Sequence, residues 1–238
     1  ALDKLHSELL GSRSGKFNAD IAARKYAETF AQHSLLINGD ENTAVESIEQ
    51  HPAKERLRSA LFEWLALSGE ARERETLAVL LRRTTTEPEP VWLNSLEKGN
   101  LDVLATFANS TPEVAMPPIV AVATSRMLAN AKREPIALKL LGQTVRQYPS
   151  DFSVNAELGM LLRKQPSSQG EAIRRLTTAL AMKPNSAGVR LELGLALYEN
   201  QQPEEALAAF QEAGRSDPYL PEAHYWASEI LLSRKATE

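Results

Sequence analysis

The sequence predicts an all-α protein in which a right-handed α-α superhelix of repeated helical hairpins follows a region of irregular helical repeats. Three prolines in the C-terminal half, Pro149, Pro184 and Pro218, lie 35 and 34 residues apart. Apolar residues recur at helical spacing along the chain, and no segment has the alternation typical of a β-strand. A fixed period of this length indicates stacked supersecondary units.

The residues that precede each proline repeat at the same offsets. An alanine lies twelve residues before each proline and a large apolar residue lies eight before it, as Ala137, Ala172 and Ala206 and as Leu141, Leu176 and Phe210. A Leu-Gly pair also recurs, as Leu158-Gly159 and Leu193-Gly194. The alternative is a generic helical bundle with accidental spacing, which would not bring these residue types together three times. Three repeats in register are therefore expected.

Each repeated residue has a physical role. A glycine inside a helix costs about 1 kcal/mol relative to alanine, so Gly194 is expected where the partner helix approaches closely, at Ala206. Phe210 is expected to fill the space between its own repeat and the next element. Pro218 ends the unit because proline lacks a backbone donor and cannot continue a helix. Pro203 is placed to begin one.

This pattern resembles the tetratricopeptide repeat, a helix–turn–helix unit of 34 residues. The resemblance implies a repeat region at 116–238, with repeats at 118–151, 152–186 and 187–220 and a capping helix at 221–235. The expected helix pairs are 118–130 with 134–147, 152–164 with 169–182, and 187–199 with 203–215. The first repeat departs most from the pattern, because Thr124-Ser125 stands where Leu-Gly is expected.

The N-terminal region, residues 1–115, is expected to be helical but less regular. Helices are expected at 18–33, in a short segment after Asp40, from Pro52 to Gly69, and at 70–83, 91–97 and 101–108. Tyr26, Phe30 and Trp64 are expected to point inward, and Glu63 is expected on an outer face. Gly11–Lys16 is similar to a phosphate-binding loop at a glance, but its spacing is one residue short. An interhelical loop is expected there.

Composition excludes several classes of protein. The chain has 27 Lys and Arg against 31 Asp and Glu, a formal charge of −4, so it offers no basic field for nucleic acid. Cysteine is absent, which excludes a disulfide framework and thiolate metal sites. No apolar run approaches the roughly 18 residues of a membrane span. The N-terminus has no signal-peptide pattern and no initiator Met, so we expect a fragment of a larger protein.

The sequence predicts no catalytic residue, no metal site, no cofactor and no small-molecule substrate. The four histidines do not pair at the spacing of metal ligands, and the Gly-x-Ser-x-Gly motif of a serine nucleophile is absent. Location is not fixed by the absence of cysteine. A cytoplasmic location is expected, although a parent protein could be anchored in a membrane outside this chain.

The whole chain also resembles the region C-terminal to the catalytic domain in a group of large bacterial serine/threonine protein kinases. The resemblance is carried by Tyr-Ala-Glu-Thr-Phe at 26–30, Ala-Leu-Phe-Glu-Trp at 60–64 and Tyr-Pro-Ser-Asp-Phe-Ser-Val-Asn-Ala-Glu-Leu-Gly at 148–159. It implies a signalling kinase as the parent protein. The chain itself has no glycine-rich loop after a strand, no His-Arg-Asp and no Asp-Phe-Gly, so it is expected to be the non-catalytic part.

The remaining function is protein binding on the concave surface that repeat solenoids present. The predicted partner-binding residues lie on the first helix of each pair and on the capping helix: Val122, Arg126, Met160, Arg163, Leu191, Leu195, Tyr198 and Tyr225. The two arginines suggest a peptide with an acidic residue beside apolar ones. Two alternatives stay open. In the first, the leucines only pack and the arginines only make the surface soluble. In the second, the chain is a free-standing adaptor or an oligomerisation scaffold of unknown oligomeric state.

Overall fold

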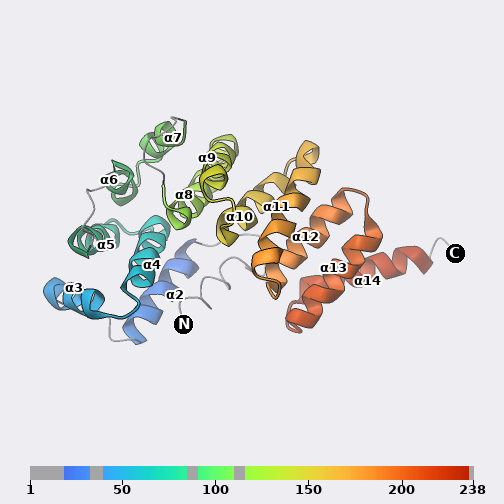
Figure 1. Cartoon of the computed structure of the whole chain (residues 1–238), viewed down its shortest axis with the longest axis horizontal. Helices are drawn as coiled ribbons and strands as arrows, with labels where there is room; N and C mark the ends of the chain where they lie inside the picture. Colours follow the sequence, from blue (N-terminus) through green and yellow to red (C-terminus); the bar gives the residue numbers. More distant parts are fainter. Residues whose placement is uncertain (1–18, 33–39, 85–90, 110–115, 236–238) are drawn as a thin grey trace. The chain divides into compact units, whose positions relative to one another are not determined.

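The computed structural model describes residues 19–32, 40–84, 91–109 and 116–235, and these ranges contain helices and no strand (Figure 1). The predicted all-α helical repeat fold is confirmed. Among the described residues, two compact units divide inside one helix, after Leu140. The first unit covers 19–140 and the second covers 141–235, whereas the sequence suggested a boundary at 115/116. Helix 118–130, expected to open the repeats, packs in the first unit against helix 54–67.

The first unit contains seven helices in its described ranges, and an eighth spans the division. They are α2 (Ala19–Gln32), α3 (Glu41–Gln50), α4 (Lys54–Leu67), α5 (Ala71–Thr84), α6 (Val91–Glu97), α7 (Leu101–Asn109), α8 (Pro118–Asn130) and, across the division, α9 (Glu134–Gln147). The second unit continues with α10 (Phe152–Arg163), a short 3-10 helix (Pro166–Ser168), α11 (Gln169–Met182), α12 (Ala187–Glu199), α13 (Pro203–Ser216) and α14 (Pro221–Lys235).

The helices begin and end where the local sequence predicts. Asp40 caps α3, its carboxylate accepting a hydrogen bond from the backbone N–H of Thr43 at 3.2 Å. Asp151 caps α10 in the same way, through Val154 at 2.9 Å. These side chains satisfy backbone donors that the first helical turn leaves unpaired. Prolines begin α8, α13 and α14, where a missing N–H costs nothing.

The core of the first unit forms around aromatic residues. Tyr26 and Phe30 of α2 are buried, as predicted, and the Phe30 ring lies 5.5 Å from that of Trp64 in α4. The prediction for Glu63 was wrong, because this residue is buried beside them. Its helical position placed it opposite the leucines of α4, but α2 and α8 both pack on α4 and enclose that side as well.

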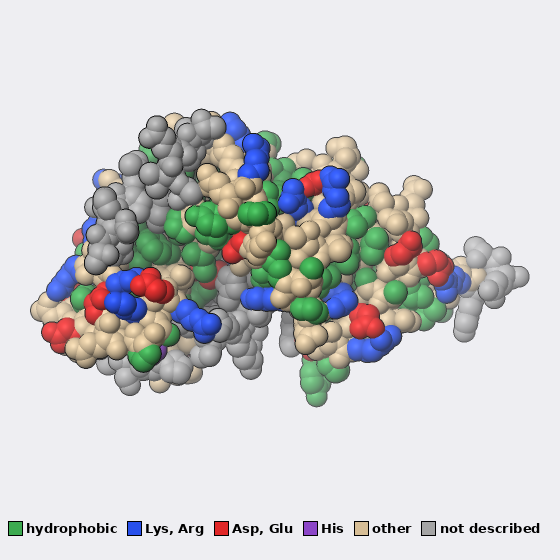
Figure 2. All heavy atoms as spheres, viewed as in Figure 1, with side chains coloured by type: hydrophobic (Ala, Val, Ile, Leu, Met, Phe, Trp, Pro, Cys, Tyr) green, Lys and Arg blue, Asp and Glu red, His purple; other side chains and the backbone are tan. Residues whose placement is uncertain are grey.

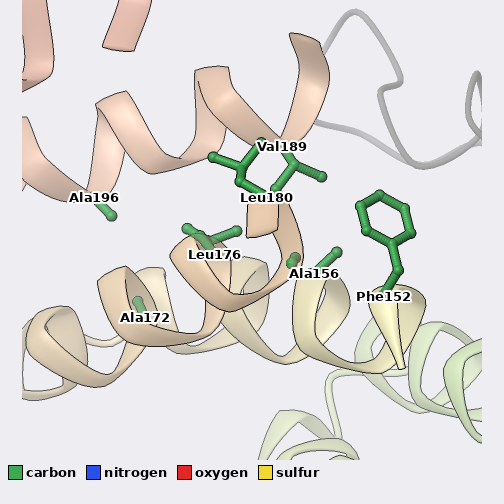
Figure 3. Packing of buried hydrophobic residues seen from close by; sticks show 8 residues of the cluster. Phe152, Ala156, Ala172, Leu176, Leu180, Val189 and Ala196 are labelled. Atoms are coloured by element: carbon green, nitrogen blue, oxygen red, sulfur yellow. The ribbon is translucent and has the colours of Figure 1, made fainter. Parts of the chain in front are cut away.

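The core of the second unit shows why the repeats contain glycine. A Cβ added to Gly159 would lie 2.7 Å from Cγ of Leu176, and one added to Gly194 would lie 2.5 Å from Cε1 of Phe210. The predicted close approach is therefore present, but Phe210 is the residue that occupies it, rather than Ala206. Figure 3 shows the buried cluster around the contact between Gly159 and Leu176. Helices α10, α11 and α12 supply its residues: Phe152, Ala156, Ala172, Leu176, Leu180, Val189 and Ala196.

Phe210 lies between the last repeat and the C-terminal helix, as predicted. Its side chain is fully buried, and its ring stacks on Trp226 of α14 with the centroids 6.2 Å apart and the planes inclined by 20°. Because Phe210 also contacts Gly194 of α12, one ring joins three consecutive helices.

Each repeat junction is closed by a side chain bonded to the carbonyl of the preceding proline. Asn155 donates to the carbonyl of Pro149 at 2.9 Å, and Arg190 donates to that of Pro184. His224 Nε2 lies 3.3 Å from the carbonyl oxygen of Pro218. The three side chains differ, but each lies six residues after its proline. The contact with the proline carbonyl therefore recurs, although the residue type does not.

Gly194→Ala should lower stability, because the new methyl group would overlap the Phe210 ring. We expect a loss of about 1–3 kcal/mol, the range for overpacking, measured as a lower urea midpoint at unchanged slope. Gly142→Ala is the matched control, since a Cβ at Gly142 meets no atom within 4 Å. It should gain about 0.5–1 kcal/mol from helix propensity.

Shortening the opposing ring tests the same contact. Phe210→Leu in the Gly194→Ala background should recover part of the loss, whereas Phe210→Ala in the parent protein should cost about 3–5 kcal/mol through the cavity it leaves. If Gly194→Ala were as stable as Gly142→Ala, the packing register of the last repeat would be incorrect.

Candidate partner-binding surface

The helices of the second unit pack on one another in chain order. The helix α11 contacts both α10 and α12, and α13 contacts both α12 and α14, so α10 to α14 follow one another side by side (Figure 1). The helices α10, α12 and α14 carry six of the eight predicted partner-binding residues. We call this set the first-helix surface; it consists of Met160, Arg163, Leu191, Leu195, Tyr198 and Tyr225.

The residues of the first-helix surface differ in how much of their side chains is exposed to solvent. Tyr198 and Tyr225 expose 42% and 58% of their surface. Met160, Leu191 and Leu195 are half-buried and pack against the core clusters, so the leucines both pack and remain partly accessible. On the face shown in Figure 2, hydrophobic side chains lie among scattered acidic and basic ones over the C-terminal helices.

An aromatic cluster joins α12 to α14. The ring of Trp226 lies 5.5 Å from that of Tyr198 at 50° and 5.4 Å from that of Tyr225 at 78°. Trp226 is half-buried and stacks on the buried Phe210 ring, so it packs between helices. The tryptophan thus fixes two exposed tyrosines to the core.

Arg163 is paired within the chain. Its guanidinium donates to Glu192 at 2.8 Å and to Glu199 at 2.6 Å, both on α12, and Gln169 donates to Glu199 at 3.1 Å. Partial burial would lower the pKa of Arg163, but the charges of the two carboxylates raise it above its ordinary value. These partners were not predicted from the sequence, although Glu192 and Glu199 lie seven residues apart on one helix and so share a face.

Val122 and Arg126 lie in the first unit and are buried, with 0% and 5% exposure. Arg126 Nη1 is 4.0 Å from one oxygen of Glu63, and the Tyr26 hydroxyl donates to the other oxygen. Burial raises the pKa of Tyr26, and the charge of Glu63 raises it further, so the hydroxyl stays protonated as a donor. Neither Val122 nor Arg126 is available to a partner in this structure, and we leave both out of the first-helix surface.

The described ranges hold no group of three or more His, Asp or Glu residues arranged to bind a metal ion. No described helix combines the length and the apolarity that a membrane crossing needs. The loop Gly11–Lys16 lies outside the described residues.

Comparison with known protein families supports the repeat assignment. The model of the tetratricopeptide repeat matches residues 169–221 and, overlapping them, residues 191–238. The predicted tetratricopeptide region is therefore confirmed for α11 to α14, which include most of the first-helix surface. The repeat at 118–151 lies outside both matches and stays a prediction. No curated protein matches the chain.

Arg126→Ala should destabilise the protein rather than change a binding surface. It leaves the carboxylate of Glu63 buried without its guanidinium, which typically costs about 3–5 kcal/mol. Arg133→Ala is the control, because its pair with Asp102 is exposed and should contribute less than about 1 kcal/mol. Urea unfolding of both variants is the measurement, and equal losses would refute a structural role for Arg126.

Arg163 and Glu192 should be energetically coupled, because both side chains are less than a fifth exposed. A double-mutant cycle of Arg163→Ala and Glu192→Ala should give a coupling of about 1 kcal/mol, weaker at high salt. The exposed pair Arg215 and Glu212 is the reference and should couple by no more than about 0.5 kcal/mol. A coupling energy of zero would show that Glu192 does not hold Arg163, so that this arginine could bind a partner.

Proposed function

We propose that this chain is a non-catalytic protein–protein interaction region that binds a peptide or protein partner on the first-helix surface. Tetratricopeptide repeats generally mediate such interactions, and the matched region includes α12 and α14. The observation that carries the proposal is the aromatic cluster, in which Tyr198 and Tyr225 stay exposed while Trp226 anchors them.

The cluster has the properties of an interface anchor. Tyr and Trp offer large contact area at low entropic cost, and they are enriched among the residues that dominate binding energy. Anchoring on Phe210 limits the motion of Trp226, so less freedom remains to be lost when a partner binds. Met160 and Leu195 extend the apolar area, and the thioether of methionine adapts to varied shapes.

The earlier expectation of an acidic ligand loses its support. It depended on Arg126 and Arg163 as carboxylate receptors. Arg126 is buried beside Glu63, and Arg163 already contacts two carboxylates on α12. An acidic partner would have to displace Glu192 or Glu199, so we propose the same surface without an acidic ligand.

We further propose that the parent protein is a bacterial serine/threonine protein kinase, in which this region recruits a substrate or regulator. The support is the resemblance of the segments at 26–30, 60–64 and 148–159. The second candidate function is a free-standing adaptor or an oligomerisation scaffold, favoured by the exposed apolar side chains of Leu231 and Leu232 on the last helix.

A photo-crosslinking amino acid placed at Tyr198 or Tyr225 should capture the partner in extract of the native cell. The same amino acid at Tyr148, an exposed tyrosine outside the cluster, is the matched control. The captured protein is then purified and titrated against Tyr198→Ala/Tyr225→Ala, which should weaken binding about tenfold or more. Equal affinity for Tyr148→Ala and the double variant would show that the first-helix surface does not bind the partner.

Light scattering over a concentration series separates recruitment from assembly. A monomer across the series supports partner recruitment. A tight dimer that Leu231→Ser/Leu232→Ser converts to monomer would support the scaffold instead.

A further inference from the structure

The aromatic cluster on α12 and α14 has a defined electrostatic character. The face of an aromatic ring carries negative potential, and a cation placed over it within about 6 Å is attracted. Tyr198 and Tyr225 each contact Trp226 at an inclined angle, so neither tyrosine is stacked flat against it. Both tyrosines are also well exposed, so ring surface remains available to an arriving cation.

Carboxylates lie on the same two helices as this cluster. Glu229 lies one helical turn after Tyr225 on α14, is exposed, and forms no hydrogen bond or ion pair with another side chain that the structure describes. Glu222 lies one turn before Trp226, and its Oε2 is buried with no hydrogen-bond partner among the described residues. Glu192 and Glu199 lie on α12, where Glu199 directly follows Tyr198.

The arginines that the structure describes on α10, α12 and α14 are already engaged. Arg163 contacts both Glu192 and Glu199. Arg190 of α12 donates to the carbonyl of Pro184, and Arg234 of α14 pairs with Glu204 of α13. Glu192 and Glu199 are thus already paired, whereas Glu229 has no cation of its own among the described side chains.

We propose that the cluster of Tyr198, Tyr225 and Trp226, with Glu229 beside it, binds a lysine or arginine side chain that is flanked by apolar residues in an extended or helical peptide. The cation lies against the tyrosine rings and pairs with Glu229, while the apolar neighbours contact Leu191 and Leu195. This inference rests on the proposed function and specifies the chemistry of its partner. It reverses the acidic ligand that the arginines suggested.

Charge and ring chemistry together select this occupant. An acidic side chain would face Glu229 and the negative ring faces without a free guanidinium to receive it. A purely apolar peptide would cover the tyrosines but would bury Glu229 unpaired, which costs free energy. A basic residue is the one that satisfies the rings and the carboxylate at once.

The test is selection of a displayed library of random ten-residue peptides on the full chain. Clones that also bind Tyr198→Ala/Tyr225→Ala are discarded. The remaining clones should be enriched in Lys or Arg beside apolar residues. A synthetic peptide of the consensus is then titrated by fluorescence anisotropy, and replacing its basic residue by norleucine should weaken binding about five- to tenfold, the combined effect of an exposed cation–π contact and an ion pair.

Matched carboxylate variants locate the cation. Glu229→Gln should weaken the consensus peptide about threefold, in line with one exposed ion pair, and should not affect the norleucine peptide. Glu212→Gln on α13 is the control. It should leave the affinity for both peptides unchanged, because Glu212 pairs with Arg215.

Three results would overturn the inference. Enrichment of Asp or Glu, or of apolar peptides without a charge, would show that the surface binds peptides of another chemistry, and the proposed function would stand. Equal effects of Glu229→Gln and Glu212→Gln would exclude the carboxylate. Recovery of no tyrosine-dependent clone would reject the inference as well, whereas failure of the photo-crosslinking experiment is what rejects the proposed function.

Discussion

The contact between Gly194 and Phe210 is the constraint on which the C-terminal part of the structure depends. The glycine removes the one atom that would overlap the ring, since its Cβ would lie 2.5 Å from Cε1 of Phe210. The ring then stacks on Trp226, and Trp226 contacts the two exposed tyrosines. A missing methyl group in the core therefore determines where aromatic side chains reach the surface, because protein interiors are too closely packed to absorb the displacement.

Arg126 and Arg163 occupy similar positions in the helical pattern but have different structural roles. Arg126 lies buried beside Glu63, to which Tyr26 also donates, and it compensates a charge that would otherwise be stranded. Arg163 is partly exposed and ties α10 to α12 through two carboxylates. Both arginines fall on helix faces where the repeat pattern places a ligand. An arginine in that pattern indicates binding only when no carboxylate of the chain reaches it first.

The sequence predicts this fold where the determining residues are local. Caps such as Asp40 and Asp151 and the prolines at helix starts act within one turn, so most helix bounds agree within a residue or two. The burial of Glu63 and the pairing of Arg163 depend on helices that approach from elsewhere in the chain. Helical periodicity does not encode that approach, and so Glu63 was assigned to the wrong face.

The junction bonds occupy the same place at the start of α10, α12 and α14. Asn155, Arg190 and His224 each reach the carbonyl of the proline before them, so the start of each first helix is held by polar side chains. The large rings of α12 and α14 then lie later along these helices, at Tyr198, Tyr225 and Trp226, whereas α10 offers Met160 and a paired arginine. Rigid rings give more binding energy per ordered side chain than a flexible thioether does. Partner binding should therefore be centred on α12 and α14, with Met160 of α10 extending the apolar area and the ion pairs of Arg163 holding α10 to α12.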